Sequence, residues 1–359
     1  MPVDVESNTS LKIAYLGPEA SFSHQAAIEV FTSQSLHPTP TLHPLPTFSA
    51  IFSSIQNPSP PPGGASYDYA VVPIENSTNG SVVQVLDLLA QCGLDSSALY
   101  PNVEVCAEYY LPVHHCLFIA SNSNAAANST DLSAHPIRTI YTHPQVWGQC
   151  GRFLSTHFAP NAAERIDVGS TSAAAQLVAS ESNGGESAAI SSKLAGQRHN
   201  LTCLAENIED EPGSNTTRFF VIRNRRCHPP QVRELNGGES SPVLGGSQSA
   251  LEANPGARYK SLITFTIPHT TPGALADTLA VFKQYSFNLT SIDTRPSRKR
   301  NWQYVFFVEC EEALSTTSPA NQNEDKSLKM MLQDLGKFTE SLRYLGRFID
   351  QLQTDNGEK

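Results

Sequence analysis

Asn215-Thr216-Thr217-Arg218-Phe219-Phe220-Val221-Ile222 changes at its middle from hydroxyl and amide side chains to aromatic and β-branched ones. The second half favours a buried strand, so the first half is expected in a loop that leads directly into that strand. Polar residues before a strand often form only a turn. Other segments of the chain join a strand, a polar turn and a helix, which makes the Thr217 loop a candidate site.

The N-terminal segment joins a short strand to a capped helix. Residues 12–16 are the expected strand, Gly17-Pro18 is a turn, and Ser21 or Ser23 can cap a helix over residues 24–31. The free N–H groups and positive dipole end of such a helix suit a carboxylate or a phosphate. An ordinary connection between a strand and a helix would have the same pattern.

A dense polar cluster follows the next expected strand, residues 69–74. Glu75-Asn76-Ser77-Thr78-Asn79-Gly80 comes directly after it, and apolar residues at helical spacing follow from Val82 to Leu89. Two interpretations stay open at this point. The first three residues of the cluster form either a solvated helix cap or a set of polar groups that bind a small oxygen-rich ligand.

A third unit begins with the expected strand 137–141. It leads through Thr142 and His143 into a helix that carries Gln145 and Gln149 one turn apart, so that both amides can face one point. They can equally be surface glutamines.

Two more units follow, with Ser170-Thr171 and Ser191-Ser192 after strands 165–168 and 187–190. This alternation predicts a parallel α/β sheet, whose ligand site lies beyond the carboxyl ends of its strands. Several helix starts would meet there and favour an anion, most simply a carboxylate.

Metal and disulfide chemistry are not indicated. His114-His115 lies within an expected strand over residues 111–120, where neighbouring side chains point to opposite faces and cannot easily chelate one ion. The seven cysteines never form a Cys-x-x-Cys pair, so neither a zinc site nor a disulfide framework is expected.

Composition restricts the partners and the location of the chain. With 359 residues, of which 39% are apolar, the chain can form two or three domains. A net charge of −10 gives no general attraction to nucleic acid or to anionic lipid. The absence of a signal-like start and of a long apolar stretch indicates a cytoplasmic protein with no membrane partner.

The C-terminal part has its own pattern. Residues 227–257 are rich in Gly, Ser and Pro and indicate a flexible linker. Residues 258–350 then alternate strands and helices in the order βαββαβ, which predicts a small α+β domain of the ferredoxin-like class. The basic stretch 297–301 is expected to be a solvated turn.

Seven motifs resemble, in chain order, those of the prephenate dehydratase family and its C-terminal ACT regulatory domain. They are 16–23 (LGPEASFS), 72–77 (VPIENS), 141–150 (YTHPQVWGQC), 170–174 (STSAA), 217–219 (TRF), 272–275 (PGAL, with Leu279) and 291–296 (SIDTRP). The chain departs from the family at Ala20-Ser21, where Gly-Thr is usual, at Thr142, where serine is usual, and at Asp293-Thr294, where Glu-Ser is usual.

The resemblance implies a two-lobed catalytic domain like that of periplasmic binding proteins over residues 11–226. Lobe one would hold residues 11–109 and 204–226, and lobe two residues 110–203, with crossovers near Tyr110 and Asn207. The implied activity is that of a carbon–oxygen lyase, which decarboxylates and dehydrates prephenate to phenylpyruvate in phenylalanine biosynthesis. Because this reaction makes the ring aromatic, no metal or redox cofactor is expected.

The resemblance also implies roles for individual residues. The expected catalytic residues are Thr217, Asn76, Gln149 and Thr142. The expected substrate-binding residues are Ser21, Glu75, Ser77, Ser170, Thr171 and Arg218, of which Arg218 is equally a candidate structural anchor. Phenylalanine would bind as an effector near Gly273, Ala274, Leu275 and Asn288, at an interface of a homodimer or homotetramer.

Two alternatives stay open. One is a dehydratase that acts on arogenate, in which an amino group replaces the keto oxygen. The other is a non-catalytic amino-acid sensor, against which the presence of Asn76, Gln149 and Thr217 argues. Too few residues precede Leu11 for a fused chorismate mutase domain, so none is expected.

Overall fold

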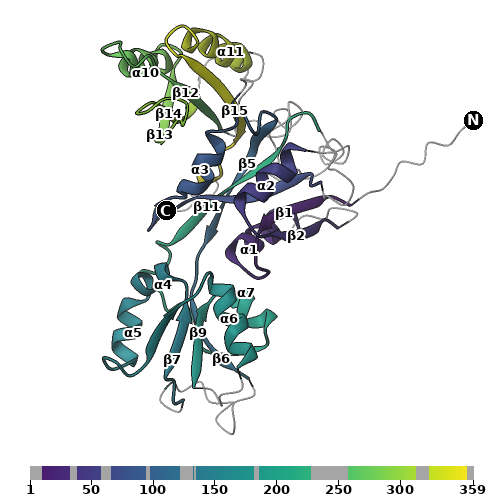
Figure 1. Cartoon of the computed structure of the whole chain (residues 1–359), viewed down its shortest axis with the longest axis vertical. Coiled ribbons are helices and arrows are strands. Elements are labelled where there is room, and N and C mark those ends of the chain that lie inside the picture. Colours follow the sequence, from purple (N-terminus) through teal and green to yellow (C-terminus); the bar gives the residue numbers. More distant parts are fainter. Residues whose placement is uncertain are drawn as a thin grey trace, which may run out of the picture.

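The computed structural model describes residues 10–32, 39–57, 66–93, 98–121, 132, 135–181, 186–227, 258–312 and 323–353. The expected linker lies outside these residues apart from Cys227. The described part forms three sheets, which Figure 1 shows one above another with the C-terminal sheet at the top. None of the described helices is long and apolar enough to cross a membrane.

The first lobe is built on a sheet with the strand order β2-β1-β3-β11-β5, and β4 pairs with β3. Its strands are β1 (Lys12–Leu16), β2 (Thr41–Leu45), β3 (Tyr69–Asn76), β4 (Gly80–Ser81), β5 (Val103–Pro112) and β11 (Thr216–Asn224). Helix α1 (Phe22–Phe31) packs on one face of the sheet, and α2 (Phe48–Gln56) and α3 (Val83–Leu89) pack on the other. The core of this lobe therefore lies on both sides of β3 and β11.

The second lobe is built on a sheet with the order β10-β6-β9-β7-β8. Its strands are β6 (Cys116–Ala120), β7 (Thr139–Thr142), β8 (Glu164–Asp167), β9 (Ser187–Ser191) and β10 (Leu201–Ala205). Its helices are α4 (Pro144–Gln149), α5 (Gly151–His157), α6 (Thr171–Ser180) and α7 (Lys193–Arg198).

Both sheets are mixed, and the prediction of a parallel sheet was wrong in this respect. Strand β11 runs antiparallel to β3 and β5, and β6 runs antiparallel to β9 and β10. These are the strands through which the chain passes from one lobe to the other. Their direction follows from that passage and not from a strand–helix unit.

Two crossover segments connect the lobes, residues 113–115 and 206–215. The single strand expected over residues 111–120 is broken here, because β5 and β6 belong to different sheets. Strand β5 stays in the first sheet as far as Pro112, which pairs with Thr216, so the crossover begins after the expected position at Tyr110. The segments bond to each other, since Val113 N–H donates to Asn215 O at 2.8 Å and Ile208 N–H donates to His115 O at 2.9 Å.

Alternation along β11 assigns its side chains to two different cores. Phe219 and Val221 pack in the cluster that contains α1, whereas Phe220 and Ile222 pack in the cluster that contains α2 and α3. Successive side chains of a strand point to opposite faces. The neighbours Thr217 and Arg218 therefore point to opposite sides of the sheet.

The C-terminal domain has one antiparallel sheet with the order β13-β14-β12-β15. Its elements are β12 (Tyr259–Thr266), α10 (Ala274–Gln284), β13 (Phe287–Pro296), β14 (Tyr304–Glu312), α11 (Asn323–Leu335), β15 (Ser341–Ile349) and the 3₁₀ turn Gln351–Gln353. The domain shares a core with the first lobe, in which the rings of Phe220 and Phe348 lie 5.5 Å apart. Gly346 allows this approach, because a Cβ atom there would lie 1.9 Å from Val105 O.

Candidate active site

A cleft of about 570 Å³ lies between the two lobes. Six of the residues predicted for the site line it, three from each lobe. They are Ser21, Asn76 and Thr217 from the first lobe and Gln149, Ser170 and Thr171 from the second. Among the described residues that line the cleft there is no Lys, Arg, Asp or Glu, and its titratable side chains are the two histidines His115 and His143.

Asn76 fixes the hydroxyl of Thr217. The register of β3 and β11 pairs these two residues, and Asn76 Nδ2 donates to Thr217 Oγ1 at 3.0 Å. The oxygen of the same amide accepts the backbone N–H groups of Thr78 and Asn79, at 3.1 and 3.0 Å, which sets the orientation of the amide. Because Oγ1 accepts from Asn76, the hydroxyl proton of Thr217 is left to donate into the cleft.

Asn215 is a cleft residue that the sequence did not single out as a site residue. Its Oδ1 accepts the second proton of Asn76 Nδ2 at 2.8 Å, and its own side chain is buried. It was quoted as the start of the polar loop, but nothing local indicated that its amide would contact the amide of Asn76, which lies 139 residues away.

Gln149 ends α4 and is held by both crossover segments. His115 Nε2 lies 2.7 Å from Gln149 Oε1, and Asp210 N–H donates to Gln149 O at 2.7 Å. Burial lowers the pKa of His115, so the ring is neutral near neutral pH. From the sequence alone, His115 was considered only as a possible metal ligand. Strand alternation could have indicated that one of the two adjacent histidines faces inward.

Two helix N-termini from opposite lobes lie at the cleft. Ser21 caps α1 and accepts His24 N–H at 3.3 Å, and Ser170 caps α6 and accepts Ala173 N–H at 3.0 Å. Both caps line the cleft. Free N–H groups and dipoles at such helix starts attract negative charge, so each lobe brings one start that favours an anion to the cleft.

The loop before α1 contacts the second lobe. Ala20 is buried in a cluster with Ala175 and Ala195 of the second lobe, and Glu19 pairs with Arg198 at 2.5 Å. Ala20 has a φ of 61°, a left-handed conformation that favours glycine. This explains why glycine is usual at this position in the family that the motif resembles.

Four predicted site residues do not line the cleft. Thr142 is fully buried and donates its hydroxyl to Ile190 O at 2.8 Å, within the second sheet. Ser77 is exposed, and its hydroxyl bonds to the backbone of the second crossover and of β11. Glu75 is exposed and lines a separate small hollow against the C-terminal domain.

Arg218, the fourth of these residues, lies on the far side of the sheet and joins two domains. Its guanidinium donates to Glu108 of β5 at 2.8 Å and, as a fork, to Glu309 of β14 at 2.8 and 2.6 Å. Burial alone would lower the pKa of Arg218, but the carboxylates of Glu309 and Glu108 outweigh it and raise that pKa. Lys260 completes the network by contacting Glu108 at 3.2 Å and Asp350 at 2.8 Å.

The residues expected to bind an effector do not meet within one chain. Gly273, Ala274 and Leu275 lie at the start of α10, and Asn288 follows the end of that helix. An α-helix of 11 residues is ~16 Å long, which separates the two groups. Asn288 instead donates to Glu311 at 2.9 Å, on the neighbouring strand β14.

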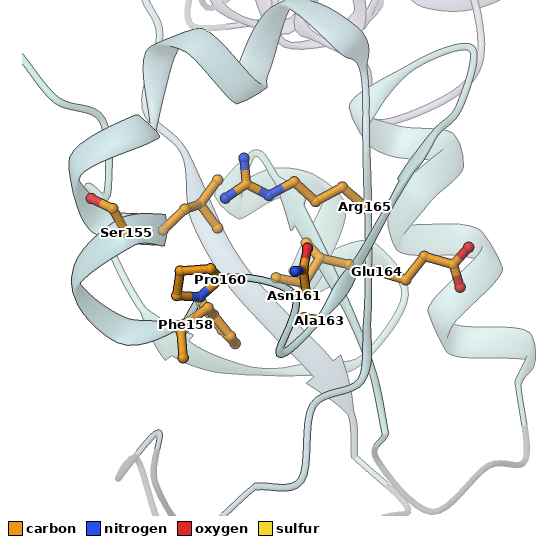
Figure 2. A pocket seen from close by; sticks show the side chains of 10 residues that line it. Ser155, Phe158, Pro160, Asn161, Ala163, Glu164 and Arg165 are labelled. Atoms are coloured by element: carbon orange, nitrogen blue, oxygen red, sulfur yellow. The ribbon is translucent and has the colours of Figure 1, made fainter.

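A larger hollow of about 750 Å³ in the second lobe is lined by none of the residues predicted for the site. Figure 2 shows Phe158 and Pro160 at this hollow, with the carboxylate of Glu164 directed away from them. Across the residues that the structure describes, no three His, Cys, Asp or Glu side chains are grouped as a metal site would require.

Comparison with known proteins follows the same division of the chain. A model of the prephenate dehydratase family matches residues 13–227, the span of both lobes. The chain is 32% identical over 367 residues to a probable prephenate dehydratase of Saccharomyces cerevisiae, covering 94% of this chain and 99% of that protein. It is 30% identical over 340 residues to the prephenate dehydratase of Lactococcus lactis subsp. cremoris, covering 94% and 97%.

Solved structures share the fold over the whole length. The prephenate dehydratase of Arthrobacter aurescens in complex with L-Phe superimposes with a TM-score of 0.68 at 23% identity, covering 95% of this chain and 90% of that one. GqqA, a quorum-quenching acylase, gives 0.67 at 22% identity, covering 95% and 99%. Since one fold serves both activities, the fold does not decide the reaction. The family match and the sequence relatives decide the family: the chain belongs to the prephenate dehydratases.

Proposed function

We propose that the cleft converts prephenate to phenylpyruvate, carbon dioxide and water, with Thr217 as the hydrogen-bond donor to the departing ring hydroxyl. The contact between Asn76 Nδ2 and Thr217 Oγ1 carries the proposal, because it leaves the hydroxyl proton of Thr217 directed at the ligand. A free threonine hydroxyl is a very poor acid. Thr217 therefore acts as a hydrogen-bond donor or as a relay that passes a proton from solvent to the departing hydroxide, and it does not itself ionise.

An uncharged cleft suits this reaction. Prephenate has two carboxylates, of which one leaves as carbon dioxide, and a cation paired with that carboxylate would stabilise the ground state more than the transition state. The N-termini of α1 and α6 and neutral amides offer hydrogen bonds without a full positive charge. Formation of the aromatic ring supplies the driving force, so the site has only to orient the substrate and assist the departure of water.

The cleft favours prephenate over arogenate. The ammonium group of arogenate needs an acceptor, most simply a carboxylate, and no Asp or Glu is among the described residues that line the cleft. The test is to mix the purified protein with each compound and to follow the absorbance of phenylpyruvate or the formation of phenylalanine. We expect turnover of prephenate well above that of arogenate. Binding without any turnover would identify a non-catalytic sensor and overturn the proposal.

We further propose that the C-terminal domain is an ACT domain that binds phenylalanine and inhibits the cleft from a distance. Its antiparallel order β13-β14-β12-β15 supports this assignment. Because Gly273 and Asn288 lie apart in one chain, an effector site that uses both takes one group from each of two copies, as in a homodimer or homotetramer. Arg218 and Glu309 offer a route from this domain to Thr217.

The regulatory proposal has its own test. Allostery requires that phenylalanine bind two states of the enzyme with different affinities. We expect added phenylalanine to lower prephenate turnover and to raise the thermal unfolding midpoint. No change in either quantity would overturn regulation and leave the catalytic proposal intact. The cytoplasmic location stays a prediction from the sequence.

A further inference from the structure

His115 is a nearly buried residue of the cleft lining, and its contacts come from three parts of the chain. The residue is 1% exposed and lies in the first crossover segment. Its backbone N–H donates to Glu209 Oε2 at 3.0 Å, and its carbonyl accepts Ile208 N–H at 2.9 Å, both from the second crossover. Its ring is nearly perpendicular to that of Phe22, with 5.9 Å between the ring centroids. The imidazole therefore has a fixed position relative to both lobes.

The hydrogen bonding of the ring decides its tautomer. Nε2 lies 2.7 Å from Gln149 Oε1, and Nδ1 is buried and has no partner among the described residues. A buried N–H without an acceptor costs more than a bare acceptor nitrogen, since orphaned donors are rarer than under-satisfied acceptors. The proton therefore belongs on Nε2, where it is donated to Gln149 Oε1.

This bond determines which end of the Gln149 amide faces the substrate. With Oε1 turned toward His115, the NH₂ group must point the other way, and Gln149 is half-buried at the cleft. The backbone of Gln149 is held separately by Asp210 N–H. Without the donor from His115, the amide could turn over and present its oxygen to an anionic substrate.

We propose that His115 is a positioning residue, which holds the carboxamide of Gln149 so that its NH₂ group donates to a carboxylate of the bound substrate. The inference rests on the proposed function and deepens it by assigning a role to a nearly buried residue of the cleft lining. His115 acts through Gln149 and does not bind the substrate itself. Its effect must therefore vanish when Gln149 has already lost its amide.

The test compares three variants of His115 that place a donor at the Nε2 position, at the Nδ1 position or at neither. His115→Gln places an amide nitrogen near the position of Nε2, whereas His115→Asn reaches only the position of Nδ1, and His115→Phe keeps the ring alone. Loss of a hydrogen bond that binds substrate and transition state equally raises KM and leaves kcat unchanged. We expect KM for prephenate to rise about 10- to 100-fold in the Phe and Asn variants and less than about threefold in the Gln variant.

The double variant His115→Phe/Gln149→Met separates positioning from packing. We expect its KM to equal that of Gln149→Met alone. Calorimetric titration with phenylpyruvate measures binding without turnover and should rank the variants in the same order as their KM values. Each of three results would overturn the inference. They are a wild-type KM in His115→Phe, equal changes in KM in the Asn and Gln variants, and a change in the double variant that equals the product of the two single changes. A wild-type protein that does not convert prephenate would instead overturn the proposed function.

Discussion

The cleft and the junction with the C-terminal domain contain opposite kinds of buried polar groups. The junction buries five charged side chains in one network, namely Arg218, Lys260, Glu108, Glu309 and Asp350. The described lining of the cleft has no such charge and relies on amides, hydroxyls and helix N-termini. Thr217 and Arg218 are neighbours in sequence, yet Thr217 lines the cleft and Arg218 belongs to the junction. Charged groups therefore join the domains, whereas the proposed function assigns neutral donors to the substrate.

The largest effect is expected from removing the neutral donor at the centre of the cleft. Thr217→Val keeps the shape of the side chain and loses the hydroxyl, so kcat should fall about 10²- to 10⁴-fold with a smaller change in KM. Thr216→Val is the matched control, because the side chain of Thr216 does not line the cleft. Steady-state kinetics with prephenate check both variants. Equal kcat values for the two would remove Thr217 from the mechanism.

Removing a charge from the junction should lower the free energy of unfolding and have a smaller effect on the turnover of prephenate. Arg218→Met leaves Glu309 buried without its partner, so the free energy of unfolding should fall by about 3–5 kcal/mol. Arg138→Met breaks an exposed pair and should cost only about 0–1 kcal/mol. Denaturant unfolding of both variants measures the difference. Similar losses would mean that the buried network does not hold the domains together.

Adding a charge to the cleft should impair substrate binding. Gln149→Glu replaces a donor by a carboxylate of the same shape that faces the two carboxylates of prephenate. We expect kcat/KM to fall about 10- to 100-fold, as repulsion between nearby like charges in a partly shielded site predicts. Gln197→Glu adds the same charge at an exposed position of α7, outside the cleft. If both substitutions changed kcat/KM equally, the neutrality of the cleft would have no special role.

The smallest effect concerns pH and the buried histidine. Burial lowers the pKa of His115 below the value of about 6.5 that it has in the unfolded chain. Between the two values the unfolded state binds more protons, so the free energy of unfolding falls as pH falls. The loss is about 1.4 kcal/mol for each unit by which the pKa is lowered. His115→Gln should flatten this part of the curve in denaturant unfolding from about pH 8 to about pH 5. An unchanged slope in the variant would mean that other groups, and not His115, cause the pH dependence of the free energy of unfolding.

Side chains whose direction follows from their own element were predicted from the sequence. Thr217 stands where a polar loop becomes a strand, Asn76 stands where a strand ends, and Ser21 and Ser170 cap helices at the positions expected for them. Local patterns of this kind also located the elements that carry these residues, whereas no element was predicted over β2, α2 or β10.

Features that depend on what packs against an element could not be predicted. Arg218 points away from Thr217, but only the C-terminal domain shows why a buried cation is tolerated there, since it supplies Glu309. Thr142 lies at the end of a strand, and its hydroxyl donates to a carbonyl of the neighbouring strand instead of facing the cleft. The contact of His115 with Gln149 joins residues 34 positions apart, so no local pattern indicated it. The mixed sheets were missed because no local pattern marks the direction of a strand.

A structure of the Thr217→Val variant with prephenate bound tests the central claim most directly, because that variant should hold the substrate without converting it. We expect the ring hydroxyl to lie against the side chain of residue 217 and beside Asn76, with the two carboxylates at the starts of α1 and α6. A ring hydroxyl far from residue 217, or carboxylates bound to charged side chains at another place, would contradict the claim.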